Sequence, residues 1–257
     1  MKIDIDVKGL DATIASLRGL ADKKIAVATV AALNDAARAG YDATRKEMAS
    51  VFNRPTPWVL GGARYVKARK DKPEAKIDFD KWGNKAGVTV ERVLAAEIAG
   101  GGRRHKRHEV ALQRVGILPT GMGIVPGAAA KLDQFGNMSS AQIVQVISWF
   151  KAFGEQGYSA NATDKTKAKR ERDNKRTGAR GFSYFALAQK RGRLLPGVYQ
   201  RFTTAFGSSV KPVMIFVRMP SYRKRLDFYG VADRAARAQF AVSFPRYLDQ
   251  MLRERAL

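Results

Sequence analysis

The feature that most constrains the fold of this chain is a long stretch near its start in which apolar residues follow the periodicity of an α-helix. Between Ala21 and Phe52, inward-facing side chains recur at the spacing of an α-helix, while charged residues fall on the opposite side. Pro55 and Pro57 follow, and the repeat ends there because neither proline can donate a hydrogen bond inside a helix. The sequence therefore predicts one long helix whose apolar face must pack against a second layer of structure. That face consists of Val30, Leu33, Ala37, Tyr41, Thr44, Met48 and Phe52.

A second long helix is predicted at the other end of the chain. It begins near Asp227 and is expected to kink at Pro245, because proline disturbs a helix interior. An apolar stripe runs along this predicted helix. That stripe consists of Phe228, Val231, Ala235, Ala238, Val242, Leu248 and Leu252.

Strand patterns lie toward both ends of the sequence. Two of them are joined by a short turn at Pro73, which predicts a β-hairpin. This order of elements predicts an α+β fold, in which one antiparallel sheet is packed by the long N- and C-terminal helices. The expected strands cover residues 2–7, 63–69, 74–82, 182–187, 198–202 and 210–218.

The middle of the chain is predicted to be an insertion, residues 83–181, within a single domain of residues 1–257. Short helices are expected at 89–98, 109–115 and from Ser139 to Phe153, and irregular structure at 121–127. The last part, residues 159–181, contains almost no large apolar side chain. We therefore expect a basic arm there that is mobile or ordered only by a partner.

Charge is the unusual part of the composition. The chain has 47 Lys and Arg against 23 Asp and Glu, a formal net charge of +24. Such an excess costs self-repulsion that phosphates or acidic surfaces relieve, so we expect a polyanion or an acidic protein as partner. The absence of cysteine excludes disulfides, thiolate zinc sites and iron–sulfur clusters. No secretory signal is recognisable, and no apolar stretch approaches the roughly 20 residues of a membrane span, so no membrane partner is expected.

The basic arm carries the strongest charge signal. Mobile cations neutralise phosphates without a fixed groove, which predicts non-specific, salt-sensitive binding of nucleic acid. An acidic face of a neighbouring subunit is an equally good partner, and the sequence does not choose between them. Tyr158, Phe182, Tyr184 and Phe185 flank the arm and are candidates for base stacking, although a core role is favoured for such residues. The candidate contact residues of the arm are Lys165, Lys167, Lys169, Arg170, Arg172, Lys175, Arg176 and Arg180.

A secondary basic patch follows three glycines at residues 100–102. His105 and His108 would share one helix face, but the cations around them repel a divalent metal, so we expect no metal site and no cofactor. The glycines are a weak phosphate-binding candidate, because the Gly-Lys-Ser/Thr ending of a nucleotide loop is missing. The patch itself comprises Arg103, Arg104, Lys106 and Arg107.

Catalytic residues are not expected. The sequence has no Gly-x-Ser-x-Gly elbow and no histidine in a context that suggests a base. The pairs Asp4/Asp6 and Asp78/Asp80 each share one face of a predicted strand, an arrangement that would suit a metal or acid–base chemistry. In a chain this basic, we favour pairing of these carboxylates with Lys and Arg. An enzyme is therefore the least favoured class of function.

Several short segments resemble a known family. Residues 32–38 (Ala-Leu-Asn-Asp-Ala-Ala-Arg) and 53–59 (Asn-Arg-Pro-Thr-Pro-Trp-Val) resemble the N-terminal half of the lambda-like phage minor tail protein Z (tail completion) family. Residues 194–199, 213–217 and 222–229 resemble its C-terminal half. The segments occur in the family's order and bracket nearly the whole chain, but the basic arm has no counterpart.

The resemblance implies a structural virion protein at the head-proximal end of a bacteriophage tail, made in the cytoplasm of the host bacterium. It also implies a tail-terminator-like fold and a homo-oligomeric ring, with six copies as an illustration, that completes the tail and borders the DNA passage. Other neck and tail proteins would be its partners, and phage DNA in the lumen a non-specific ligand. The residues alone leave an alternative, a monomeric protein that binds nucleic acid non-specifically through the arm.

Overall fold

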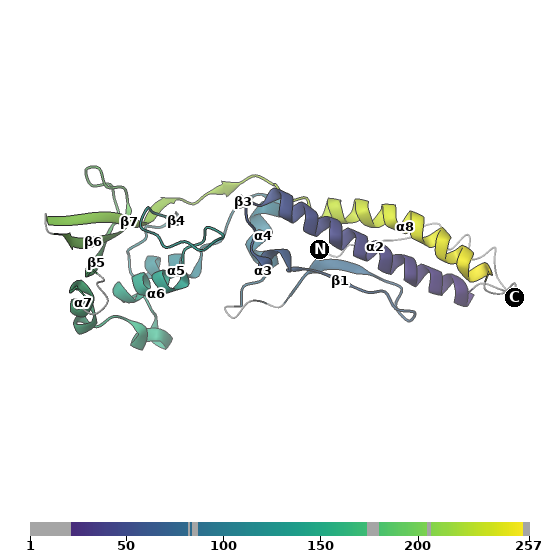
Figure 1. Cartoon of the computed structure of the whole chain (residues 1–257), viewed down its shortest axis with the longest axis horizontal. Helices are drawn as coiled ribbons and strands as arrows, with labels where there is room; N and C mark the ends of the chain where they lie inside the picture. Colours follow the sequence, from purple (N-terminus) through teal and green to yellow (C-terminus); the bar gives the residue numbers. More distant parts are fainter. Residues whose placement is uncertain (1–21, 82, 84–86, 174–179, 205–206, 254–257) are drawn as a thin grey trace. The chain divides into compact units, whose positions relative to one another are not determined.

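The structure is a computed structural model that describes residues 22–81, 83, 87–173, 180–204 and 207–253. The strand expected at residues 2–7 lies outside this part. The chain divides into two compact units (Figure 1). We call Met1–Gly101 together with Tyr222–Leu257 the helical unit, and Gly102–Ser221 the sheet unit. No helix in the described residues is long and apolar enough to cross a membrane.

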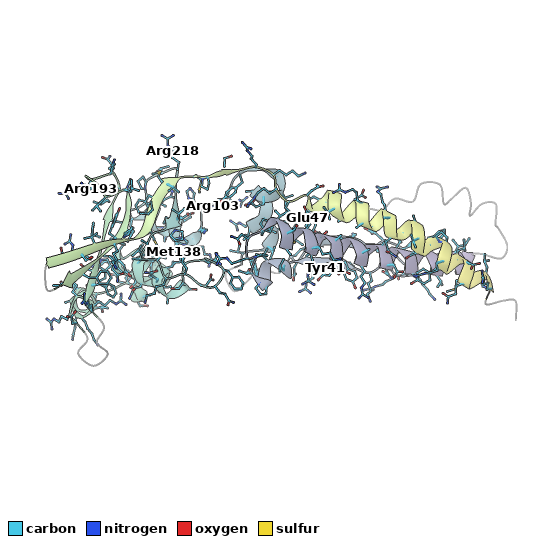
Figure 2. The ribbon with its side chains drawn as sticks, turned by 45° about the horizontal axis from the view of Figure 1, so that its top comes forward. Tyr41, Glu47, Arg103, Met138, Arg193 and Arg218 are labelled. Carbon is cyan, nitrogen blue, oxygen red and sulfur yellow. The ribbon has the colours of Figure 1, made fainter. Side chains whose placement is uncertain are left out.

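The helical unit is built on two long helices that lie side by side, α2 (Asp22–Val51) and α8 (Phe228–Arg253) (Figures 1 and 2). Small side chains let them approach closely. A Cβ atom added to Gly40 of α2 would lie 2.8 Å from the carbonyl oxygen of Ala232 on α8. Both long helices were expected from the sequence, and both are confirmed. The small buried residues of the two helices include Ala28, Ala32 and Ala36 on α2 and Ala232 and Ala236 on α8, the last two next to Gly40.

The stripe predicted for α8 is wrong by about one residue. The helix buries Phe228, Ala232, Ala236 and Ser243, whereas Val242 is 65% exposed. The close approach of α2 admits only small side chains at the contact, so size decides which face is buried rather than hydrophobicity. The helix continues through Pro245 to Arg253.

The predicted hairpin is confirmed and covers the helices. Its strands, β1 (Ala63–Val66) and β2 (Lys76–Phe79), pair antiparallel with Ala63 opposite Phe79. The Phe79 and Phe228 rings stack with their centroids 4.1 Å apart, which joins the hairpin to α8. Asn34 of α2 fixes the chain after β1, because its Oδ1 accepts from the Ala68 N–H at 2.7 Å and its Nδ2 donates to the Ala68 carbonyl at 3.3 Å. Two short helices complete this unit, α3 (Pro57–Leu60) and α4 (Val90–Ala99).

The sheet unit contains a four-stranded antiparallel sheet with the strand order β4-β7-β6-β5. Its strands are β4 (Met122–Pro126), β5 (Phe182–Leu187), β6 (Gly197–Thr204) and β7 (Gly207–Arg218). Helices α5 (Arg107–Arg114) and α6 (Ser140–Trp149) share a core with the sheet. Two-residue strands β3 (Gly101–Gly102) and β8 (Ser221–Tyr222) pair separately. The buried core includes Leu112, Val146, Val198, Met214 and Phe216.

The α+β class is confirmed, with antiparallel sheets and long N- and C-terminal helices. The expectation of one sheet is wrong, because the hairpin and the four-stranded sheet are separate and have separate cores. Residues 122–126 form β4 where irregular structure was expected, since pairing with β7 overrides their glycine and proline content. The assignment of 1–257 as one domain with 83–181 as an insertion stays a prediction.

Candidate nucleic-acid and partner interface

Positive charge is concentrated in the sheet unit. Residues 102–221 contain 21 Lys and Arg against 6 Asp and Glu, a net charge of +15, whereas the rest of the chain has 26 against 17, a net charge of +9. Three of the six acidic residues, Glu109, Asp133 and Asp173, accept hydrogen bonds from backbone N–H groups of the same unit. Arg193 and Arg218 are exposed and project outward from this unit (Figure 2). Its surface is therefore strongly cationic.

The first half of the predicted basic arm is a helix. Residues Asp164–Glu171 form α7, and the Thr163 hydroxyl caps it by accepting from the Thr166 N–H at 3.2 Å. The expectation of an arm over residues 159–181 that is mobile or ordered only by a partner does not hold for this stretch, which is helical without one. Lys175 and Arg176 lie outside the described residues, and Arg180 is exposed.

The chain before α7 is fixed to the end of α6, and these contacts explain why a segment with so few apolar side chains is ordered. The Ser148 hydroxyl donates to the Ala160 carbonyl at 2.6 Å, and the Ser148 carbonyl accepts from the Ala162 N–H at 2.9 Å. The Asn161 side chain accepts from the Phe153 N–H at 3.1 Å and donates to the Phe153 carbonyl at 3.2 Å. Hydrogen bonds therefore replace the apolar burial that the sequence lacks here.

The cations of α7 divide into two groups. Lys165 and Lys169, four residues apart and so on one face, are exposed, as is Arg172 at the end of the helix. On the inner side, the Lys167 ammonium lies 5.5 Å from the centre of the Trp149 ring. Arg170 is half-buried, and one of its terminal nitrogens is buried without a hydrogen-bond partner among the described residues. The outer group is available to a partner, whereas Lys167 and Arg170 face the rest of the unit.

The inner cations of α7 meet an aromatic cluster beside β5. The Trp149 and Tyr184 rings are edge to face at 5.7 Å, and the Tyr184 hydroxyl donates to Gln145 at 2.8 Å. Burial raises the pKa of Tyr184 to about 12, although the nearby charge of Arg170 opposes this shift. These aromatic side chains are part of the packing of the unit, which agrees with the core role favoured for Tyr184 from the sequence.

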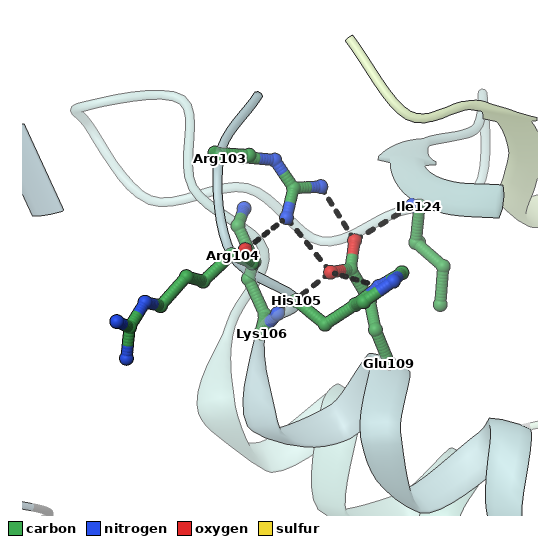
Figure 3. A network of polar contacts seen from close by, with 6 residues as sticks. All are labelled: Arg103, Arg104, His105, Lys106, Glu109 and Ile124. Carbon is green, nitrogen blue, oxygen red and sulfur yellow. Dashed lines mark hydrogen bonds and ion pairs between the residues drawn. The ribbon is translucent and has the colours of Figure 1, made fainter. Parts of the chain in front are cut away.

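The secondary basic patch is smaller than predicted, because Arg103 is used inside the unit (Figure 3). Its terminal nitrogens donate to the two oxygens of Glu109 at 2.6 and 2.8 Å. The Glu109 side chain is fully buried and also accepts from the N–H groups of Lys106 at 2.6 Å and Ile124 at 2.8 Å. Burial alone would raise the pKa of Glu109, but these donors lower it to about 2. Arg104, Lys106 and Arg107 remain exposed.

On each outer strand of the four-stranded sheet, one backbone group is bonded by a side chain of the same unit. On β4, the Ile124 N–H donates to the Glu109 carboxylate. On β5, the Tyr184 carbonyl accepts from the Trp149 indole at 2.8 Å. These groups would otherwise be open to pairing with a strand of another chain. We therefore expect partners to meet this unit through side chains rather than by adding a strand at these two positions.

The candidate catalytic and metal residues do not come together. Asp80 pairs with Arg64 at 3.1 Å, and Asp78 accepts from the Phe79 N–H at 2.8 Å, while Asp4 and Asp6 lie outside the described residues. Within the described part, no three acidic or histidine side chains are grouped as metal ligands. The Nδ1 atom of His105 lies 3.6 Å from a carboxylate oxygen of Glu109. For the other histidine, His108, burial together with the charge of Lys106 lowers the pKa to about 4.

Comparison with protein families gives one match. Residues 7–125 match the family model described as Prophage minor tail protein Z (GPZ). The matched range includes both segments, 32–38 and 53–59, that carry the N-terminal resemblance, whereas residues 194–229 lie beyond it. Searches of curated proteins and of solved structures find no match.

Proposed function

We propose that this chain, whose residues 7–125 match the prophage minor tail protein Z (GPZ) family, is a structural protein of a phage tail that forms a ring near the head–tail junction. The ring completes the tail and borders the passage of the DNA. The sheet unit faces the DNA, and the exposed side of α7 contacts its backbone. Other neck and tail proteins contact the remaining surfaces.

The observation that carries this proposal is the uneven distribution of charge. The sheet unit has a net charge of +15, and Lys165, Lys169 and Arg172 point away from its core. Cations on a surface of this kind are stabilised by phosphates, which need no base-specific groove. Binding is therefore expected to be independent of DNA sequence.

Electrostatic screening decides which surface of the ring meets the DNA. At physiological salt, charges more than about 8 Å apart interact weakly, so only side chains close to the DNA gain from it. Copies that each carry a net charge of +24 also repel one another, and polyanionic DNA relieves this repulsion. With the more cationic sheet unit toward the passage, its side chains lie close enough to the DNA to gain from it, and the DNA offsets the repulsion between copies.

The proposal is tested by reversing charge on the exposed side of α7. In the full chain, Lys165→Glu, Lys169→Glu and Arg172→Glu are combined and DNA affinity is measured over a series of salt concentrations. The matched control combines Arg38→Glu, Arg45→Glu and Lys46→Glu, three exposed residues of α2 that give the same change in net charge. We expect the α7 variant to lose affinity and to lower the salt slope by about 3, since each phosphate contact contributes roughly 0.9.

Two results would contradict the proposal. Equal losses in the two variants would show that total charge matters rather than the α7 surface. A wild-type chain that binds no DNA at low salt would remove the nucleic-acid contact altogether. Either result leaves the family assignment unaffected, because that assignment depends on residues 7–125.

A monomeric nucleic-acid-binding protein is the second candidate. The observation that favours this candidate is that the edge groups of Ile124 and Tyr184 are already bonded within the unit. They are therefore not open to pairing with a strand of another subunit. Sedimentation and analysis of purified particles separate the two functions. The ring predicts a defined oligomer that is incorporated into the tail, and the alternative predicts a monomer that is absent from particles.

A further inference from the structure

Tyr158 is the most exposed of the large apolar side chains in the described residues, with 74% of its surface accessible to water. It lies in a short 3₁₀ helix, η1 (Glu155–Ala160), six residues before α7 begins at Asp164. An aromatic ring this exposed contributes little to the core of the sheet unit. Because it lies close in the sequence to α7, which has four Lys and Arg among its eight residues, it is a candidate for contact with a partner.

The backbone that carries Tyr158 is fixed rather than loose. Its own carbonyl accepts from the Asn161 N–H at 3.0 Å, and the Asn161 side chain is bound to Phe153. The next turn is held by the hydrogen bond from Ser148 to the Ala160 carbonyl. A ring presented on a fixed backbone loses little conformational entropy on binding, which favours stacking with a flat partner.

The other aromatic residues that flank α7 are already engaged. Tyr184 is buried, and the Phe182 ring packs edge to face against it at 5.2 Å. Phe185 stacks on Tyr199 at 5.4 Å and lies 4.9 Å below the Arg201 guanidinium. Of the four aromatic residues considered for stacking from the sequence, Tyr158 alone presents most of its surface to solvent.

We propose that Tyr158 stacks on an unpaired base of single-stranded nucleic acid whose phosphates are bound by the exposed side of α7. Exposed aromatic rings combined with cationic side chains bind single strands without sequence preference. Bases inside an intact duplex are already stacked on each other, so this ring gains a partner only where the strands are separated or end. The inference rests on the proposed function and adds a preference for unpaired strands.

The test compares the full-length wild type with Tyr158→Ala for binding to a labelled oligothymidylate and to a duplex of the same length. Stacking is worth about 1–3 kcal/mol per base, so the variant is expected to lose at least about 5-fold in affinity for the single strand. Its affinity for the duplex is expected to stay unchanged, because the α7 cations are intact. Tyr158→Phe keeps the ring and is expected to retain single-strand affinity.

Val144→Ala is the matched control, since Val144 is another exposed apolar residue of this unit, on α6. It is expected to change neither affinity. Equal affinity of Tyr158→Ala and wild type for the single strand, in a chain that binds DNA, overturns this inference alone. If Tyr158→Ala loses oligomer formation but keeps its affinity for the single strand, the inference is also overturned, because the Tyr158 side chain would then contact protein. A wild type that binds neither oligonucleotide overturns the proposed function instead.

Discussion

Ser243 on α8 donates a hydrogen bond of 2.9 Å to Asp35 on α2, although the two residues are 208 positions apart in the chain. The same carboxylate oxygen also accepts from Arg246 at 2.9 Å and from the Tyr247 hydroxyl at 3.0 Å. One acidic side chain therefore binds three donors of α8. This contact joins the two ends of the chain within the helical unit.

Replacing Asp35 with alanine is expected to destabilise the protein by about 2 kcal/mol, because the buried Ser243 hydroxyl loses an acceptor and Arg246 loses its ion pair. Asp42→Ala is the control on the same helix, at an exposed position, and should change the free energy of unfolding by less than about 0.5 kcal/mol. Urea denaturation of both variants measures the difference. Similar values for the two would mean that the Asp35 contact contributes nothing specific.

A second prediction concerns Gly40, where the usual effect of glycine in a helix should be reversed. Gly→Ala in a helix interior normally stabilises by about 1 kcal/mol. Here the new Cβ would lie 2.5 Å from Ile77 Cδ1 and 2.8 Å from the Ala232 carbonyl oxygen, and the second contact is with backbone. Gly40→Ala is therefore expected to lower the midpoint of thermal unfolding. A higher midpoint would show that α2 and α8 do not pack this closely.

The Arg103–Glu109 pair supports a third prediction. Arg103→Ala leaves a fully buried carboxylate without its countercharge, which is expected to cost about 3–5 kcal/mol. Arg103→Lys keeps the charge but loses the two-pronged contact, so an intermediate loss is expected. Arg104→Ala changes an exposed neighbour and serves as the control. If Arg103→Ala unfolds at the same urea concentration as Arg104→Ala, the buried pair does not exist in solution.

The fourth prediction is a dependence of stability on pH. Burial lowers the pKa of His108 from 6.5 to about 4, so the unfolded chain binds this proton at a higher pH than the folded chain does. Stability is then lost as the pH falls from about 6.5 to about 4. The pKa of Glu109 is lowered from 4.5 to about 2, so its contribution is lost in a later window, as the pH falls from about 4.5 to about 2.

His108→Gln separates the two windows. This variant is expected to lose the decline in unfolding free energy between about pH 6.5 and pH 4.5 while keeping the decline at lower pH. The measurement is urea denaturation at a series of pH values. A His108→Gln profile that follows the wild type through the upper window would refute the assignment of that slope to His108.

Much of the fold could be predicted because long periodic patterns are strong signals. The α2 helix, the β1–β2 hairpin and strand β5 occur where the sequence places them. The buried stripe of α8 was misplaced because helix contact there selects Ala and Ser, and a hydrophobic pattern ranks Val242 above them. Strand β4 was missed because it forms through pairing with β7, a contact between distant residues.

The candidate site was predictable in composition but not in geometry. The cations of the arm were identified, yet only the structure divides exposed Lys165 and Lys169 from Lys167 against Trp149. The order of α7 depends on hydrogen bonds from Ser148 and Asn161, which no local pattern reveals. Arg103 was assigned to the surface, because nothing in the spacing of Arg103 and Glu109 indicates that the carboxylate is buried.

A reconstruction of the head-proximal end of the tail by electron cryomicroscopy tests the central claim most directly. We expect a closed ring of this chain at that end, with residues 102–221 toward the DNA passage and the exposed side of α7 next to the DNA density. A single copy, a ring at the opposite end of the tail, or a ring whose residues 102–221 face outward from the passage would contradict it.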